Sequence, residues 1–553
     1  MTITANIVDI INSRCFYGDC FVEAGQILSI QELSDEKPGS PYLMPGFIDA
    51  HVHIESSMLV PTEFARLAVR HGTVATVSDP HEIANVLGIE GVEYMLKNAV
   101  QTPFKFYFGV PSCVPATKFE TAGDTLDANA VRKLLQRDEL CYLAEMMNYP
   151  GVIYSDPEVI AKIDAAKEIG KPIDGHAPGL TGDAAITYIN AGISTDHECV
   201  SYEEALHKLQ HGMKIIIRDG SAAKNFEALH RLISAYPDMV MLCSDDKHPD
   251  DLVVGHINKL AARAIAKGHR WPDILRAGCV NPVLHYGLQV GLLQSGDPAD
   301  MILVRDLESF DVLTTYIDGV EVFSKMKVRL PEVKTETANR FSTSAVSVDE
   351  LRLEGQSDHD VRIIHAIDGS LITGEMHARL PVSDDGYYLT DRNKDILKIV
   401  VVNRYEKSAP AIAFIHGFGL KKGAIASSVA HDSHNIVAVG VDDKSLVQAI
   451  NLVIAARGGI AAVDARLPTG TSHEHEEVLA LPIAGIISGL PGEEVAKLYT
   501  RIDHFSKAAL GSTLKSPFMT LSFMALLVIP QLKLSDKGLF DGGQFRFVRL
   551  EVE

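Results

Sequence analysis

The stretch MPGFIDAHVHIESS, from Met44 to Ser57, decides the fold of this chain. It begins as an apolar, β-rich run and ends in the polar residues His51, His53 and Glu55. Residues i and i+2 of a strand point to the same side, so both imidazoles can reach one metal ion. The pair alone is weak evidence, because histidines exposed at the rim of a sheet would give the same pattern.

Seven more β-rich runs follow this first strand, which we expect to extend from Tyr42 to Ile54. They are GTVATVSDP (72–80), FKFYFGVPSC (104–113), LCYLAEMMN (140–148), PIDGHAP (172–178), ISTDHEC (193–199), MKIIIRD (213–219) and VMLCSDD (240–246). Stretches of helical period lie between them, such as SDPEVIAKIDAAKEIG and SYEEALHKLQHG. Eight βα units in about 240 residues predict a (β/α)8 barrel of the TIM type over residues 42–285.

The segments on either side of this barrel differ from it in pattern. Residues 1–41 and 286–330 show short alternating runs with turn signals such as Asp318-Gly319, and we expect them to pair into one small β-sandwich-like domain. Residues 331–345 are polar and lack periodicity, which predicts a linker. Residues 346–553 then form a mixed α/β domain. The predicted fold class is therefore α/β in three parts.

Composition excludes several classes of function. The 553 residues include 46% hydrophobic and 22% charged residues, as in ordinary folded proteins, and a net charge of −21 disfavours nucleic acid and anionic membranes as partners. The start of the chain lacks the features of a signal peptide, and no apolar run is long enough for a spanning helix. Seven cysteines without a CxxC pair fit a reducing, cytoplasmic setting. We expect a small-molecule ligand.

Further metal-ligating residues occur where later strands are expected to end. They are Glu145, His176, His197 and Asp245. Together with His51 and His53 they would meet at the C-terminal mouth of a barrel, where active sites of this fold lie. Carboxylates with imidazoles suit Mn, Fe or Zn, and six ligands are too many for one open catalytic ion. The pattern predicts two ions with a shared bridging oxygen.

Four other residues near the same rim are candidates for contact with the substrate. Glu55 can touch metal or substrate, or be a hydrogen-bond partner of a ligand. His81 and Glu82 lie in SDPHE, where Asp79 and Glu82 can instead form a helix capping box. Arg218 ends the seventh strand, where a salt bridge at the rim is the favoured alternative to substrate contact.

Three features of the C-terminal part also bear on the chemistry. His431, Asp432 and His434 either form a local polar loop, which we favour, or reach into the barrel mouth. The stretch HGFGLKKGA from His416 lacks the spacing of a phosphate-binding loop and predicts a turn between strands. TSHEHEEV from Thr471 predicts a helix start rather than a metal site. Neither HExxH nor PCxxC occurs, which argues against zincin proteases and zinc nucleoside deaminases.

The motifs together resemble the amidohydrolase superfamily. The carriers are MPGFIDAHVHIESS, the single late histidines, SDD from Ser244, and NPVLHYGLQVGLLQSGDPADMILV from Asn281. Many binuclear members use a carboxylated lysine on the fourth strand as the bridge, where this chain offers Glu145. That residue, with SDPHEIANVLG, GHAPGL, TDHECVSYEEA, SDDKHPDDL and HGFGLKKGAIASSVAHDSHN, resembles the branch of adenine deaminases over nearly the whole chain.

This resemblance implies an activity, and the chemistry of the residues can be compared with it. It implies hydrolysis of adenine to hypoxanthine and ammonia, with Mn²⁺ or Fe²⁺ favoured over Zn²⁺ and a homodimer or larger assembly. Attack at purine C6 requires hydroxide, which a metal supplies by lowering the pKa of bound water. Asp245 is the candidate base, and Glu145 can bridge the metals or protonate N1. The rival interpretation is an amidohydrolase acting on a cyclic amide or an N-acyl sugar, since metal ligands alone do not choose a substrate.

Overall fold

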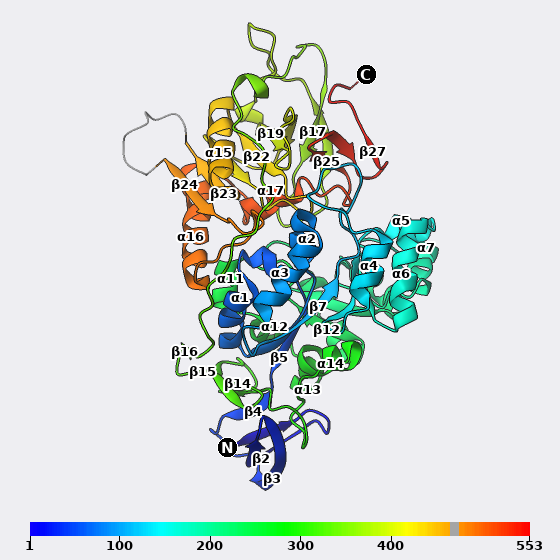
Figure 1. Ribbon diagram of the computed structural model, residues 1–553, viewed down its shortest axis with the longest axis vertical. Coiled ribbons are helices and arrows are strands. Elements are labelled where there is room, and N and C mark those ends of the chain that lie inside the picture. Colours follow the sequence, from blue (N-terminus) through cyan, green and yellow to red (C-terminus); the bar gives the residue numbers. More distant parts are fainter. Residues whose placement is uncertain (465–474, 553) are drawn as a thin grey trace.

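The structure is a computed structural model that describes residues 1–464 and 475–552. Figure 1 shows three regions along the long axis: a small sheet near the N-terminus, a middle region of strands surrounded by helices, and a mixed region that contains the C-terminus. Alternating strands and helices fill the middle region, so the predicted α/β class is confirmed.

Eight parallel strands form a closed ring in the middle region. The sheet β5-β6-β7-β8-β9 is followed by the sheet β10-β11-β12. The amide of Ser194 donates to the carbonyl of Ile173 (2.9 Å) between β9 and β10, and the amide of Asp245 donates to the carbonyl of His51 (2.9 Å) between β12 and β5. The strands are β5 (Phe47–Val52), β6 (Thr73–Ser78), β7 (Lys105–Val110), β8 (Leu140–Met146), β9 (Ile173–Gly175), β10 (Thr195–Asp196), β11 (Lys214–Arg218) and β12 (Val240–Cys243).

Helices follow each strand of the ring and cover its outside. Both quoted helical stretches are confirmed: SDPEVIAKIDAAKEIG contains α6, and SYEEALHKLQHG contains α8. Asp156 and Ser201 cap these helices by accepting hydrogen bonds from backbone amides. The helices are α1 (Pro61–Ala68), α2 (His81–Leu87), α3 (Ile89–Ala99), α4 (Ala128–Leu135), α5 (Tyr149–Ile153), α6 (Pro157–Ile169), α7 (Gly182–Asn190), α8 (Tyr202–Gln210), α9 (Phe226–Leu229), α10 (Leu232–Ala235), α11 (Pro249–Val254), α12 (Ile257–Ala266), α13 (Trp271–Leu275) and α14 (Asn281–Tyr286).

The small sheet joins both flanks of the ring in the order β16-β15-β14-β13-β4-β1-β2-β3. Its strands are hydrogen-bonded into one continuous sheet, and side chains from both flanks share an apolar cluster. They are β1 (Thr2–Asp9), β2 (Arg14–Glu23), β3 (Gln26–Asp35), β4 (Tyr42–Pro45), β13 (Met301–Val304), β14 (Val312–Ile317), β15 (Val320–Ser324) and β16 (Lys327–Val328).

The expected single strand from Tyr42 to Ile54 is wrong. Its first four residues form β4 in the small sheet, and the ring strand β5 begins at Phe47. The pairing partner changes at Gly46, whose amide donates to Asp300, whereas the amide of Phe47 donates to Gly72. A Cβ at Gly46 would lie 2.4 Å from Cγ1 of Val74, so only glycine allows the chain to pass here.

The C-terminal region is built on a second eight-stranded sheet, in the order β18-β17-β20-β19-β22-β21-β23-β24, and a small sheet β25-β26-β27. Its elements are β17 (Val361–His365), β18 (Gly374–Ala378), β19 (Ile396–Val402), β20 (Ala411–His416), β21 (Ala424–Ser427), β22 (Ile436–Gly440), α15 (Asp443–Ala455), β23 (Gly459–Val463), β24 (Glu476–Ala480), α16 (Gly492–His504), α17 (Pro517–Phe523), β25 (Leu532–Ser535), β26 (Gly538–Asp541) and β27 (Arg546–Phe547). The predicted turn after His416 is confirmed. Residues 471–474 of TSHEHEEV lie outside the described residues, and its end belongs to β24 rather than to a helix.

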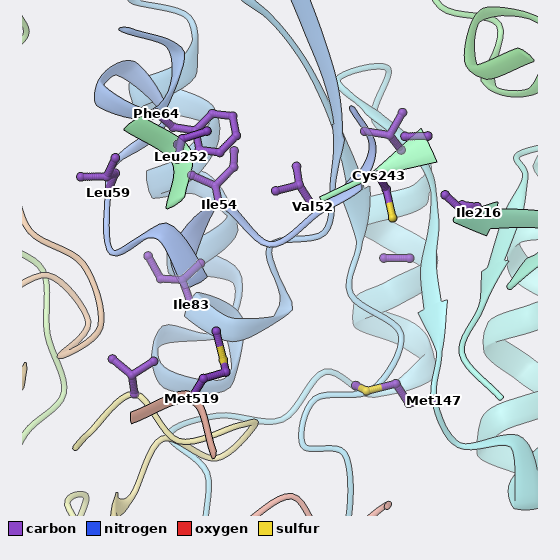
Figure 2. Close-up of a cluster of buried hydrophobic side chains, with 14 of the residues drawn as sticks. Val52, Ile54, Leu59, Phe64, Ile83, Met147, Ile216, Cys243, Leu252 and Met519 are labelled. Carbon is purple, nitrogen blue, oxygen red and sulfur yellow. The ribbon is translucent and has the colours of Figure 1, made fainter. Parts of the chain in front are cut away.

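One hydrophobic core runs through the ring and into the C-terminal region. Figure 2 shows Val52 and Cys243 from the ring in the same cluster as Phe64 of α1 and Met519 of α17. The C-terminal region is therefore packed firmly on the mouth of the ring. Within the described residues, every helix is too short or too polar to cross a membrane.

Candidate active site

The six predicted ligands meet at the carboxyl ends of the ring strands, and we call them the strand-end cluster. Parallel strands place these ends at the same side of a ring, which is why residues so far apart in sequence converge. Each of the six is at least 95% buried. The members are His51, His53, Glu145, His176, His197 and Asp245.

Glu145 lies at the centre of this cluster. Its Oε1 lies 3.3 Å from Nε2 of His53 and 3.5 Å from Nδ1 of His81. Its Oε2 lies 2.7 Å from Nδ1 of His176 and 3.2 Å from Nε2 of His197. The two oxygens thus face different pairs of histidines.

Asp245 closes the cluster from the other side. Its Oδ1 lies 3.5 Å from Nε2 of His51 and 3.3 Å from Nε2 of His53, and its Oδ2 accepts from Arg218. Its φ of +53° lies in the left-handed region, which costs free energy in a residue with a Cβ. Backbone hydrogen bonds to His51 and from His53 hold it in this conformation.

The donor set of this cluster fits a divalent metal. Its ligand atoms form sets of three that lie within 4.8 Å of one another, such as His51, His53 and Asp245. Both ring nitrogens of His197 and Nε2 of His176 are buried without a hydrogen-bond partner among the described residues; Nε2 of His197 is close to Glu145 but not aligned with it. Unpaired buried imidazole nitrogens beside carboxylates are consistent with a metal site.

The four candidate substrate residues fall into two groups. His81 and Glu82, at the start of α2, line the pocket above the cluster. The alternative capping box is absent, because Asp79 accepts from the amide and ring of His81 while Glu82 turns toward the C-terminal region. Glu55 accepts from the amide of Ile83 (3.2 Å), and Arg218 forms buried ion pairs with Glu198 and Asp245.

A second cluster of histidines and carboxylates spans the ring and the C-terminal region. Glu82 Oε1 lies 2.9 Å from Nε2 of His431, and Glu82 Oε2 lies 2.6 Å from Nε2 of His434. His431 also lies 3.3 Å from Asp246. Asp432 lies 3.8 Å from His81. The favoured prediction of a local polar loop is wrong, since these residues reach the mouth. We call Glu82, Asp246, His431, Asp432 and His434 the second cluster.

Electrostatics favour charge on Asp245, Glu82 and His431, whereas burial lowers the pKa of His197 and of His434. Burial alone would raise the pKa of Asp245, but Arg218, His51 and His53 hold it well below its ordinary value. Burial likewise opposes the charge on Glu82, yet His431, His81 and His434 hold its pKa well below the usual range. Burial lowers the pKa of His431, but Glu82 and Asp246 raise it well above that of a free histidine.

Two features of the pocket have no counterpart in the sequence predictions. Glu198 follows His197, lines the pocket and forms a bidentate ion pair with Arg218. The apolar part of the lining is Met147, Leu371, Phe523 and Leu526, of which the last three come from the C-terminal region. The adjacency of Glu198 to His197 is a signal that sequence inspection can use; the apolar lining leaves none.

Comparison with known proteins finds similar sequences over nearly the whole chain. The model of the amidohydrolase family matches residues 42–322, and that of the adenine deaminase C-terminal domain matches residues 370–546. An adenine deaminase of Sulfurovum sp. (strain NBC37-1) is 56% identical over 548 residues, 99% of each chain. An adenine deaminase of Salinibacter ruber is 56% identical over 508 residues, 92% of this chain and 91% of that protein. One of Methanosarcina barkeri is 52% identical over 552 residues, 98% of each chain.

A ring of parallel strands with histidines and carboxylates gathered at its mouth, matched by the family model, defines a hydrolase of the amidohydrolase family. Sequence identity above 50% to adenine deaminases, over nearly the full length, defines the family more closely: the chain belongs to the adenine deaminase family. The resemblance drawn from its motifs is thereby confirmed.

Proposed function

We propose that this protein hydrolyses adenine to hypoxanthine and ammonia, as a step in purine salvage. The observation that carries the proposal is the strand-end cluster, in a chain that matches adenine deaminases along its whole length. A buried set of histidines and carboxylates beside a small pocket suits hydrolysis of a compact, flat substrate.

The metal would be held by the strand-end cluster. We propose two ions, because six ligands of mixed nitrogen and oxygen type exceed the needs of one open site. The resemblance to adenine deaminases favours Mn²⁺ or Fe²⁺ over Zn²⁺. When bound, a divalent metal lowers the pKa of water, so that hydroxide is available at neutral pH. The two oxygens of Glu145 face different pairs of histidines, which favours a bridging role for Glu145 over protonation of purine N1.

Asp245 is the residue that moves the proton in this proposal. Its Oδ1 faces His51 and His53, while Arg218 fixes Oδ2, so one oxygen stays directed at the centre. From there Asp245 would take the proton of the attacking hydroxide and deliver it to the departing amine. His81 and Glu82 line the pocket and remain our candidates for contact with the purine, whereas Glu55 and Arg218 support neighbouring residues.

The same proposal covers the organisation of the chain. Residues 42–285 would be a (β/α)8 barrel of the TIM type, except for β4 (Tyr42–Pro45), which joins the small sheet. Residues 1–41 with 286–330 would be a small β-sandwich-like domain, residues 331–345 a linker, and residues 346–553 a C-terminal α/β domain. Seven free cysteines support a reducing, cytoplasmic setting. We further propose a homodimer or larger assembly.

A direct assay tests the activity. The purified protein, loaded with manganese, is incubated with adenine, and ammonia and hypoxanthine are measured. We expect both products in equal amounts. Release of no ammonia, together with turnover of a cyclic amide or an N-acyl sugar, would favour the rival amidohydrolase activity.

A further inference from the structure

The walls of the pocket are unequal in polarity. Histidines and carboxylates of the strand-end cluster and the second cluster make most of the lining, and the apolar groups come mainly from the C-terminal region. The two faces of a purine ring offer no hydrogen-bonding groups, so a protein that holds such a ring needs an apolar or aromatic surface beside its polar contacts. Leu371, Phe523 and Leu526, which we call the roof, provide this surface.

The roof is assembled from separate segments of the C-terminal region. Phe523 ends α17 and is 98% buried, with its ring 5.2 Å from that of His431. Leu371 lies on the loop between β17 and β18. Leu371 also lines a neighbouring cavity that reaches Cys199 and Ala228, so the loop forms the wall between the two spaces.

A buried lysine connects these two segments. Lys533 of β25 is fully buried, and its ammonium donates to the carbonyl of Leu371 (2.7 Å) and to that of Phe523 (2.9 Å). Among the described residues, these carbonyls are its hydrogen-bond partners and no carboxylate pairs with it. Burial lowers the pKa of Lys533 to about 7.

Burying an ammonium without an acidic partner is costly, so an apolar residue would serve better if Lys533 only filled space. Its position beneath two pocket-lining residues gives it a different use. Thr373 adds a second tie between the same loop and β25, because its hydroxyl donates to the carbonyl of Leu532 (2.8 Å). The remainder of α17 is anchored in the core through Met519 (Figure 2). The loop and the end of α17 are thus held in register with each other.

We propose that Leu371 and Phe523 form the surface against which the flat purine ring packs, and that Lys533 is a positioning residue that holds the two segments together. This inference rests on the proposed function, since it takes adenine as the ligand. Lys533 touches neither the reacting atoms nor the strand-end cluster, so its loss should weaken substrate binding more than the chemical step.

The test compares Phe523→Ala, Leu371→Ala and Lys533→Met with Lys398→Met. Lys398 is an equally buried lysine of β19 that donates to the carbonyl of Leu351 (2.9 Å) and to Asp443, outside the roof. We expect Phe523→Ala to raise KM for adenine at least about fivefold, the lower bound for loss of base stacking on an aromatic ring. Lys533→Met should raise KM similarly, with kcat within about threefold and metal content unchanged. The KM of the double variant Phe523→Ala/Lys533→Met should be no higher than that of the more affected single variant. Lys398→Met should leave KM unchanged.

Several results would overturn the inference. An unchanged KM in Phe523→Ala and Leu371→Ala would do so even if Lys533→Met fails to fold. A fall in kcat alone for folded Lys533→Met would remove its positioning role. If the unsubstituted protein releases no ammonia from adenine, the proposed function fails and the purine-binding roof fails with it. If the unsubstituted protein is active and the roof variants have the same KM for adenine, only the roof is rejected.

Discussion

Two buried clusters of histidine and carboxylate share one pocket, but they are built differently. The strand-end cluster is fixed by the main chain, because its six members sit at the ends of strands that are hydrogen-bonded into one ring. The second cluster is assembled by docking, since His431, Asp432 and His434 come from the C-terminal region and meet Glu82 and Asp246 of the ring loops. A closed ring preorganises the first cluster, whereas the second exists only when both regions are packed together.

The largest expected effect comes from removing the proton acceptor of the strand-end cluster. Asp245→Asn keeps the size of the side chain but cannot take a proton, and we expect kcat for adenine to fall about 10²- to 10⁴-fold with the fold retained. Steady-state kinetics and a thermal melt measure the two quantities. Asp219→Asn is the matched control at the end of β11, where Asp219 pairs with Arg263 (3.2 Å) away from the pocket. Near-normal turnover by Asp245→Asn would remove the assigned base.

A smaller effect separates the two clusters by their metal content. His51→Ala removes one ligand from the strand-end cluster, so elemental analysis should show less metal per chain. Glu82→Gln removes a charge that lines the pocket and faces His431 and His434. The metal should stay while kcat/KM falls about 10- to 100-fold, the cost of losing a hydrogen bond to a charged group. Equal loss of metal in both variants would contradict the division into two clusters.

The contrast also explains which residues could be predicted from the sequence. His51 and His53 can be predicted because side chains alternate along a strand. Glu145 and Asp245 can be predicted because they are polar residues at the ends of apolar runs. Glu198 is absent from the predicted set although it adjoins His197, because beyond the end of β10 at Asp196 alternation does not fix where its side chain points. Glu198 in fact pairs with Arg218.

The remaining differences arise from contacts between distant segments. The pairing of Glu82 with His431 depends on how the C-terminal region docks, which no local pattern encodes. The strand from Tyr42 to Ile54 is divided at Gly46 for a similar reason. An apolar run predicts extended backbone, but its partner strands are set by tertiary packing.

The last expected effect is on stability rather than on turnover, and it concerns a carboxyl behind the second cluster. Glu120 is 95% buried, its Oε2 has no hydrogen-bond partner among the described residues, and its Oε1 accepts from Thr117 (3.2 Å). Burial and then the charge of Asp432 raise the pKa of Glu120 to about 8, against about 4.5 in the unfolded chain. The folded protein therefore holds a proton that the unfolded chain releases, and this stability is present below about pH 4.5 and is lost as pH rises through about 8.

Glu120→Gln fixes the neutral form at nearly the same size. We expect the unfolding free energy of Glu120→Gln, relative to the unsubstituted protein, to increase between pH 5 and 8, by at most about 1.4 kcal/mol per pH unit. Thermal or denaturant unfolding at several pH values measures the trend, with Glu90→Gln as an exposed control that should show none. A relative stability that is flat or falls with pH would show that Glu120 is ionised in the folded protein. The docked C-terminal region would then have to supply a cationic partner for Glu120 beside Asp432, and the second cluster would be more highly charged than its described contacts imply.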